Sequence, residues 1–278
     1  MPPTSDNSGP IPATEPSRKG ALLTIAGFDP SSGAGITADL AVFAANGWYG
    51  VSAITALTVQ STQGVNRIEP VSPETIRDTL AALEADLPIA GIKLGMLGTA
   101  ANVDVIADFL EGRPGTLAVL DPVFCSSSGH ELLSLDGLHQ LQERLLGKVG
   151  WITPNLQELA ALTGKPAGSP EQIPAAARLL QKKTGGGINV VVTGGHLQRP
   201  DDFLLTAKGN ELWLRGEKVD TNSTHGTGCA FSSALLCHLA AGDGPETAVR
   251  AAKAYVTEAL RSAMPLGKGR GPLNLHRH

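Results

Sequence analysis

The feature of this sequence that most constrains its fold is a regular alternation of short, apolar, β-branched runs with longer segments of helical periodicity. Strand-like runs occupy residues 21–27, 50–60, 91–97, 116–123, 150–155 and 188–195. Helical patterns lie between them, as at residues 33–47 and 72–87. Strands that alternate with helices require crossover connections, so the sequence predicts a mainly parallel sheet covered by helices.

The alternation is interrupted once, near the carboxyl end. Residues 202–216 hold two alternating runs around Lys-Gly-Asn, which predict a β-hairpin, and the last helix is expected over about residues 244–264. No linker or internal repeat divides residues 20–278, so we expect one domain there. Residues 1–19 carry five prolines and no apolar run, and they predict a disordered extension.

Charge and cysteine content exclude several classes of protein. The net charge is −4 and no lysine or arginine cluster stands out, which disfavours nucleic-acid binding. The longest apolar stretches are too short to cross a bilayer. Cys125, Cys229 and Cys237 form no zinc spacing, and an odd count without a signal peptide indicates a reducing compartment. We therefore expect a cytoplasmic protein with no membrane partner.

Glycine-rich and polar turns follow the predicted strands. They occupy residues 27–35, 59–64, 95–98, 121–129, 153–158 and 193–196. In an open parallel sheet, ligands bind outside the carboxyl ends of the strands. We expect these turns to meet on one face and to form a binding site.

The segment THGTGC, residues 224–229, precedes a nearly uncharged helical run. Glycines let the main chain approach an anion closely, and the free amides at a helix start can bind a phosphate. An ordinary glycine turn that opens a buried helix would look the same. The chain has no Walker sequence, and Ala38 replaces the last glycine of a dinucleotide fingerprint.

Two residues are candidates for a catalytic or metal-binding role, one within this segment and one at a strand end. Cys229 lies in the first turn of the predicted helix, where the dipole should lower the thiol pKa and let it accept a proton from a hydroxyl. The alternative is a small residue chosen for packing. Asp121 directly follows a buried strand and could hold Mg²⁺, or it could simply form the turn.

Five further polar residues are candidates for the site, and most of them have two interpretations. Asn155 and Glu158 could serve a metal-bound triphosphate, or they could form a capping box at a helix start. Gln60 could pair with a heteroaromatic edge or lie on the surface. Asp39 lies within an apolar helical segment, where it either faces solvent or makes a specific contact. His225 is a turn residue that could touch phosphate.

Several motifs taken together are far more specific than any one alone. In chain order they are TIAGFDPSSGAGITADL, AITALTVQSTQGV, KLGMLG, LDPV, ITPNLQEL, VVVTGGH and STHGTGCAFSSAL. This series resembles the hydroxymethylpyrimidine/phosphomethylpyrimidine kinases of thiamine biosynthesis, a branch of the ribokinase-like superfamily. The resemblance covers about residues 20–275 and implies a three-layer α/β/α sandwich without a large lid.

The resemblance also implies an activity and a site. The expected reaction is ATP- and Mg²⁺-dependent phosphorylation of 4-amino-5-hydroxymethyl-2-methylpyrimidine and then of its monophosphate, by a homodimer. The implied pyrimidine contacts are Gln60 and Asp39, with a pocket lined by Gly27, Met96 and Val123. The implied metal ligands are Asp121 and Glu158, and the implied ATP contacts are Asn155, Thr193, Thr224 and His225. Gly226, Thr227, Gly228 and Cys229 would form the anion hole, with Cys229 as the base.

The sequence departs from this family at several positions. The family often has Gln and Lys where Thr37 and Ala41 stand, a methionine at Phe124 and a basic residue near Ser127. The alternatives are a pyridoxal kinase of the same superfamily, a non-catalytic precursor sensor on this fold, and a nicotinamide-dependent oxidoreductase. Comparing turnover on the pyrimidine alcohol with turnover on pyridoxal would separate the pyrimidine kinase from the pyridoxal kinase. The missing dinucleotide fingerprint disfavours the oxidoreductase.

Overall fold

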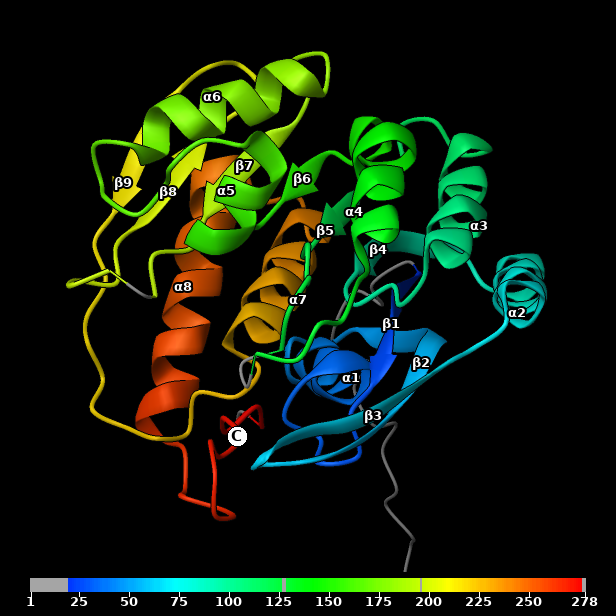
Figure 1. The fold of residues 1–278 in the computed structure, drawn as a ribbon, viewed down its shortest axis with the longest axis horizontal. Coiled ribbons are helices and arrows are strands. Elements are labelled where there is room, and N and C mark those ends of the chain that lie inside the picture. Colours follow the sequence, from blue (N-terminus) through cyan, green and yellow to red (C-terminus); the bar gives the residue numbers. More distant parts are fainter. Residues whose placement is uncertain (1–19, 127–128, 196, 277–278) are drawn as a thin grey trace, which may run out of the picture.

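A nine-stranded sheet runs through the part of the chain that the computed structural model describes, which is residues 20–126, 129–195 and 197–276. The strands are β1 (Ala21–Phe28), β2 (Tyr49–Ser61), β3 (Gly64–Pro70), β4 (Ile89–Leu94), β5 (Ala118–Leu120), β6 (Trp151–Ile152), β7 (Asn189–Val192), β8 (Asp202–Leu205) and β9 (Glu211–Leu214). Their spatial order is β3-β2-β1-β4-β5-β6-β7-β8-β9 (Figure 1). The inner strands from β2 to β7 are parallel, and antiparallel strands close both edges.

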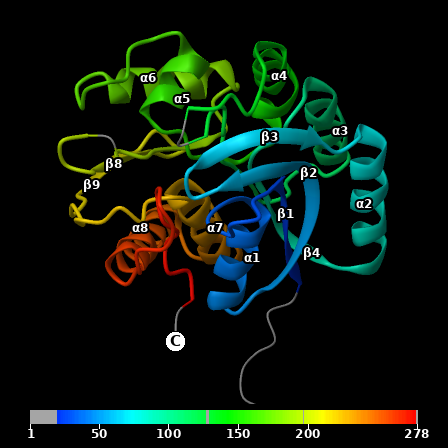
Figure 2. The same cartoon turned by 60° about the horizontal axis from the view of Figure 1, so that its bottom comes forward.

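Helices cover both faces of this sheet. They are α1 (Gly35–Ala45), α2 (Pro73–Asp86), α3 (Ala100–Glu111), α4 (Leu135–Gln140), α5 (Leu156–Thr163), α6 (Ile173–Lys183), α7 (Thr227–Ala240) and α8 (Pro245–Arg261), with the short turns η1 (Leu141–Leu145) and η2 (Leu146–Lys148) after α4. Helices α1, α7 and α8 pack on one face, and α2 to α6 pack on the other (Figure 2). The predicted three-layer α/β/α sandwich is therefore confirmed.

The inner strands are apolar because both of their faces are buried. In β7, Val190 and Val192 point into one core and Val191 into the other. In β1, Leu23 likewise points into the first core and Leu22 into the second. This explains why these strands read as continuous apolar runs rather than as an alternating pattern.

Local signals at the helix starts act as expected. The Ser72 hydroxyl accepts a hydrogen bond from the Thr75 amide, and Pro73 occupies the first turn of α2. The predicted hairpin is confirmed as β8 and β9, which pair antiparallel. The disordered extension predicted at residues 1–19 lies outside the described residues.

One strand was not predicted. Residues 61–64 turn the chain back, and β3 pairs antiparallel with β2 at the sheet edge (Figure 2). Its side chains are partly or fully exposed, and Arg67 pairs with Glu69 on its surface. An edge strand of this kind has no buried face, so it carries little apolar periodicity. None of the helices in the described ranges combines the length and the apolar character that a membrane span needs.

Candidate active site

A cavity of about 840 Å³ opens at the carboxyl ends of the parallel strands. Gly27 and Phe28 at the end of β1 border it, as do Met96 after β4 and Asp121 after β5. Thr193, which follows β7, closes the other end. The cavity thus lies at the edge of the sheet where the turns were expected to meet.

The structure brings almost all of the expected site residues to this cavity. The lining includes Gly27, Gln60, Met96, Asp121, Val123, Asn155, Glu158, Thr193, Thr224, His225, Gly226, Thr227, Gly228 and Cys229. These residues come from turns that are far apart in the sequence. The contact that each makes with a ligand stays a prediction.

Asp39 is the exception, and its predicted role needs correction. Its side chain is 0% exposed and is not part of the cavity lining. One carboxylate oxygen accepts hydrogen bonds from Thr24 Oγ1 at 2.6 Å and from Lys93 Nζ at 2.9 Å. The other accepts one from Ser233 Oγ at 2.8 Å. A carboxylate enclosed in this way does not line the cavity, and its charge acts there through neighbours such as Lys93 and Cys229, which border it.

Lys93 was missed by the sequence analysis. It sits within β4, and its side chain is 0% exposed. Burial alone would lower the pKa of Lys93, but the charges of Asp39, Cys229 and Asp121 outweigh burial and raise it. A Cβ built on Gly95 would lie 2.8 Å from Lys93 Nζ, so the glycine leaves room for the ammonium group. A lysine within a strand buried on both faces was the available signal, because such a charge needs a partner.

The turn 226–229 has the geometry expected of an anion-binding loop. Gly226 is the N-cap of α7 with φ +84°, and no side chain caps the helix. A Cβ on Gly226 would lie 1.7 Å from the carbonyl oxygen of Gly33, so only glycine fits. Within the described ranges, no side chain accepts a hydrogen bond from the first amides of α7, and residues 227–229 line the cavity. Asp121 lies alongside, with Oδ2 3.5 Å from a Cβ built on Gly228.

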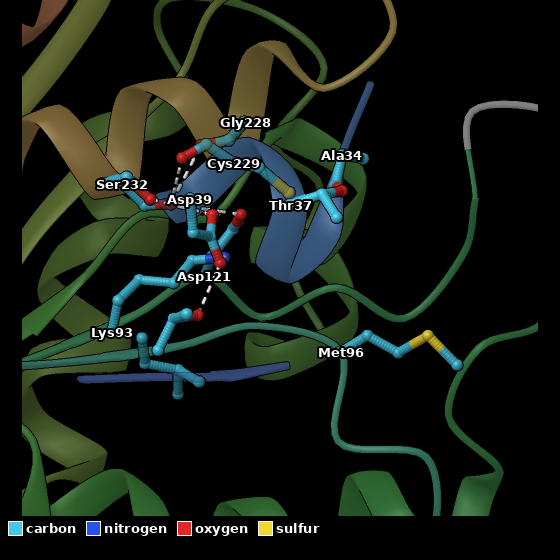
Figure 3. A network of polar contacts seen from close by, with 12 residues as sticks. Ala34, Thr37, Asp39, Lys93, Met96, Asp121, Gly228, Cys229 and Ser232 are labelled. Atoms are coloured by element: carbon cyan, nitrogen blue, oxygen red, sulfur yellow. Dashed lines mark hydrogen bonds and ion pairs between the residues drawn. The ribbon is translucent and has the colours of Figure 1, made fainter. Parts of the chain in front are cut away.

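The expected acidity of Cys229 is wrong. Burial raises the pKa of its thiol to about 12, and the charges of Asp39 and Asp121 add to this. The charge of Lys93 and a hydrogen bond with the Gly35 backbone lower the pKa, but by less than burial raises it. The helix dipole, which favours a lower pKa, is therefore outweighed by burial and by two buried carboxylates from other elements (Figure 3).

Asp121 and Glu158 are two buried carboxylates that interact. Burial raises the pKa of Asp121 to about 6, although Lys93 opposes the shift. Burial and the charge of Asp121 raise the pKa of Glu158 well above its usual range. Glu158 also accepts the Asn155 amide, so the capping box named as the alternative is present.

A divalent cation fits this pair of carboxylates. Two buried acids that repel each other are stabilised when a cation binds between them. Mg²⁺ typically takes one or two carboxylates and completes its shell with water and phosphate oxygens. No cluster of three or more His, Cys, Asp or Glu residues in the described ranges could hold a metal alone. Asp121 and Glu158 therefore suit a metal that arrives with a phosphate ligand.

A further buried carboxylate, Asp29, was not singled out from the sequence. It is 2% exposed and accepts hydrogen bonds from Ser31 and from the Ala34 amide at 2.9 Å. Its Oδ2 lies 2.7 Å from His225 Nε2. Burial alone would raise the pKa of Asp29, but the hydrogen bonds from His225 and Ser31 lower it to about 2. The pair joins the loop after β1 to the residue that precedes the 226–229 turn.

The opposite end of the cavity is built from β6, β7 and α8. Asn155 and Thr193 form a bridge between neighbouring strand ends. Lys253 on α8 borders the cavity, where its Nζ lies 2.6 Å from Asp202 and 2.8 Å from the Pro200 carbonyl oxygen. The sequence analysis did not single out Lys253. A lysine beside Ala252 and Val256 on the apolar side of an amphipathic helix was its only signal.

Comparison with known proteins assigns the chain to a family. The family model described as phosphomethylpyrimidine kinase matches residues 29–274. Hydroxymethylpyrimidine/phosphomethylpyrimidine kinase of Haemophilus influenzae is 42% identical over 258 residues, covering 91% of this chain and 95% of that protein. The crystal structure of phosphomethylpyrimidine kinase from Clostridium difficile 630 is 33% identical with a TM-score of 0.76, covering 86% of this chain and 99% of that one. An ADP complex of Bacillus subtilis pyridoxal kinase is 31% identical with a TM-score of 0.83, covering 93% and 97%. The chain therefore belongs to the phosphomethylpyrimidine kinase family, within the ribokinase-like fold.

Proposed function

We propose that this protein transfers the γ-phosphoryl group of ATP to 4-amino-5-hydroxymethyl-2-methylpyrimidine and then to its monophosphate. The product is the diphosphate used to make thiamine diphosphate. One observation carries the proposal: a single cavity joins an acceptor end, a glycine turn with free amides, and a nucleotide end in a member of this kinase family.

The acceptor end suits a small heteroaromatic ring. Gln60 offers an amide that can both donate and accept hydrogen bonds, as an aminopyrimidine edge requires. Met96 and Val123 supply an apolar surface for the ring. Gly27 lies directly beside Met96, since a Cβ there would meet its sulfur at 2.8 Å. These contacts support a ring held between Gln60 and the 226–229 turn.

The transferred group is handled mainly by position and charge. The amides of Thr227, Gly228 and Cys229 would bind the phosphoryl oxygens as negative charge builds on them. Asp121 and Glu158 would hold Mg²⁺, which when bound neutralises phosphate charge. Asn155 and Thr193, together with Thr224 and His225, would contact the triphosphate. Phosphoryl transfer depends more on these effects than on strong base catalysis.

Cys229 remains our candidate for the group that takes the hydroxyl proton. Its raised pKa means that the thiol is protonated in the free enzyme at neutral pH. We therefore assign it a smaller share of the rate than the amides beside it. The monophosphate acceptor is already ionised at neutral pH, so its phosphorylation depends less on a base.

Pyridoxal is the second candidate acceptor, because among solved structures a pyridoxal kinase (31% identical, TM-score 0.83) is about as similar to this chain as a phosphomethylpyrimidine kinase (33% identical, TM-score 0.76). A coupled assay of ADP release with the pyrimidine alcohol, its monophosphate and pyridoxal tests the assignment. We expect turnover with both pyrimidines and a kcat/KM for the alcohol well above that for pyridoxal. A preference for pyridoxal, or no turnover with either pyrimidine, would contradict the proposal.

We further propose that the enzyme works as a homodimer in the cytoplasm. Leu57 and Val59 on β2, and Tyr49 at its start, are large apolar side chains left exposed, which supports a contact with a second copy. Cys125 and Cys229 are free thiols, which supports a reducing compartment. Light scattering after size exclusion measures the assembly, and a mass of one chain would contradict the dimer.

A further inference from the structure

A smaller cavity of about 370 Å³ adjoins the acceptor end of the large one. The two cavities share Gln60, Val65, Ser126, Asn222, His225 and Arg270. The smaller cavity lies where the tip of the β2–β3 hairpin meets the segment that follows α8 (Figure 1). It is therefore an annex of the acceptor end and lies away from the nucleotide end.

The segment after α8 is held at this place by close main-chain contacts. A Cβ on Gly269 would lie 2.0 Å from the carbonyl oxygen of Thr62, and one on Gly267 would lie 2.2 Å from the Thr62 hydroxyl. On the other side, the His225 amide donates to the carbonyl oxygen of Gly271 at 3.1 Å. The main chain on either side of Arg270 is thus held between the hairpin and the residue that directly precedes the 226–229 turn.

The charge of the smaller cavity favours an anion. None of the described residues that line it is a carboxylate, and Arg270 is its one permanently charged group. Within the described ranges, no hydrogen bond or ion pair engages the Arg270 guanidinium, whereas Arg67 and Arg250 pair with nearby carboxylates. Lys268, two residues away, borders neither cavity. An unpaired guanidinium at the wall of a substrate cavity is suited to a phosphate.

We propose that Arg270 binds the phosphate of the pyrimidine monophosphate and so determines how well the enzyme performs the second phosphorylation. The inference rests on the proposed function. The first acceptor is a neutral alcohol and gives Arg270 nothing to pair with, while the second carries a phosphate. That phosphate must lie beside the 226–229 turn, because one of its oxygens attacks the γ-phosphorus. Arg270 reaches this region from the acceptor side, next to His225.

The test compares the two acceptors in Arg270→Gln. Because the variant loses charge-assisted hydrogen bonds to the phosphate, we expect its KM for the monophosphate to rise by about 10- to 100-fold. We expect kcat with the monophosphate to fall much less, and kcat/KM with the alcohol to stay within about 2-fold. Arg270→Lys should recover part of the loss. Lys268→Gln removes a charge from the same segment and should leave both acceptors unchanged.

A direct binding measurement separates the loss of a phosphate contact from a general effect on the structure. Calorimetric titration with the monophosphate alone should show the same 10- to 100-fold loss of affinity in Arg270→Gln, with an unchanged melting temperature. Equal losses for both acceptors, or an unchanged KM for the monophosphate, would overturn the assignment of Arg270. The wild-type enzyme reports separately on the proposed function, which fails if the alcohol itself is not phosphorylated.

Discussion

Replacing Lys93 by Met tests the buried charge cluster beneath the active site. The change removes the ammonium that lies 2.9 Å from an oxygen of Asp39, while both side chains are 0% exposed. Methionine keeps most of the volume, so packing changes little. Asp39 keeps the hydroxyl donors Thr24 and Ser233 but loses its only opposite charge among the described residues.

The size of the effect follows from burial. Breaking a buried ion pair by removing one partner costs about 3–5 kcal/mol, because the remaining charge has no compensation. Asp39→Asn alone should also destabilise, since it leaves the ammonium of Lys93 without its main partner. The double variant Lys93→Met/Asp39→Asn has neither charge. We expect it to be more stable than the sum of the single changes predicts, by about 2–3 kcal/mol.

Urea unfolding followed by circular dichroism measures the free energy of unfolding for all four proteins. The same proteins, assayed at saturating ATP, give KM for the pyrimidine alcohol. We expect Asp39→Asn to alter stability and kcat while KM changes by less than about 3-fold. Additive destabilisation would refute the pairing. A large and selective rise in KM, without loss of stability, would restore the direct contact of Asp39 with the pyrimidine.

Three further changes test other parts of the site. Gly226→Ala should lower kcat in the ADP-release assay by about 10²–10³, since it displaces an amide of the turn. The control Gly115→Ala is also at positive φ but has nothing within 4 Å of the added Cβ, so it should leave kcat unchanged. Cys229→Ala should slow alcohol phosphorylation far more than monophosphate phosphorylation; equal losses in single-turnover experiments would argue against a base at this position. Asp29→Asn removes a carboxylate whose pKa would be raised by burial but is lowered from 3.8 to about 2 on folding by hydrogen bonds from His225 and Ser31. This shift stabilises the protein by on the order of 2 kcal/mol above pH 4. Because that contribution is lost as pH falls from about 4 to 2, denaturation curves of wild type and variant should converge in this window, and a gap that persists at pH 2 would contradict the assignment.

Much of the architecture could be predicted because it depends on local pattern. Both-face burial makes β1 and β7 predominantly apolar, and the turns between strands and helices are marked by glycine or by caps such as Ser72. The position of the cavity followed from the topology alone. In contrast, β3 lies at an edge with exposed side chains and leaves no periodic signal.

The electrostatics of the site could not be read in the same way. The Asp39–Lys93 pair joins residues 54 positions apart, and the His225–Asp29 pair joins residues 196 apart. Local sequence fixes neither contact. Asp39 was expected at the ligand because of the resemblance to the kinase family, whereas the structure places its carboxylate against a buried lysine. The thiol of Cys229 was judged by its helix alone, while its pKa is set mainly by burial and by charges from other elements.

The central claim is that the amides of residues 226–229 bind the phosphoryl group in transfer. A crystal structure with a non-hydrolysable ATP analogue, Mg²⁺ and the pyrimidine alcohol tests it directly. We predict that oxygens of the terminal phosphate lie about 3 Å from the amide nitrogens of Gly228 and Cys229, with the alcohol oxygen on the opposite side of the phosphorus. A terminal phosphate bound elsewhere in the cavity, with these amides facing only water, would contradict the account.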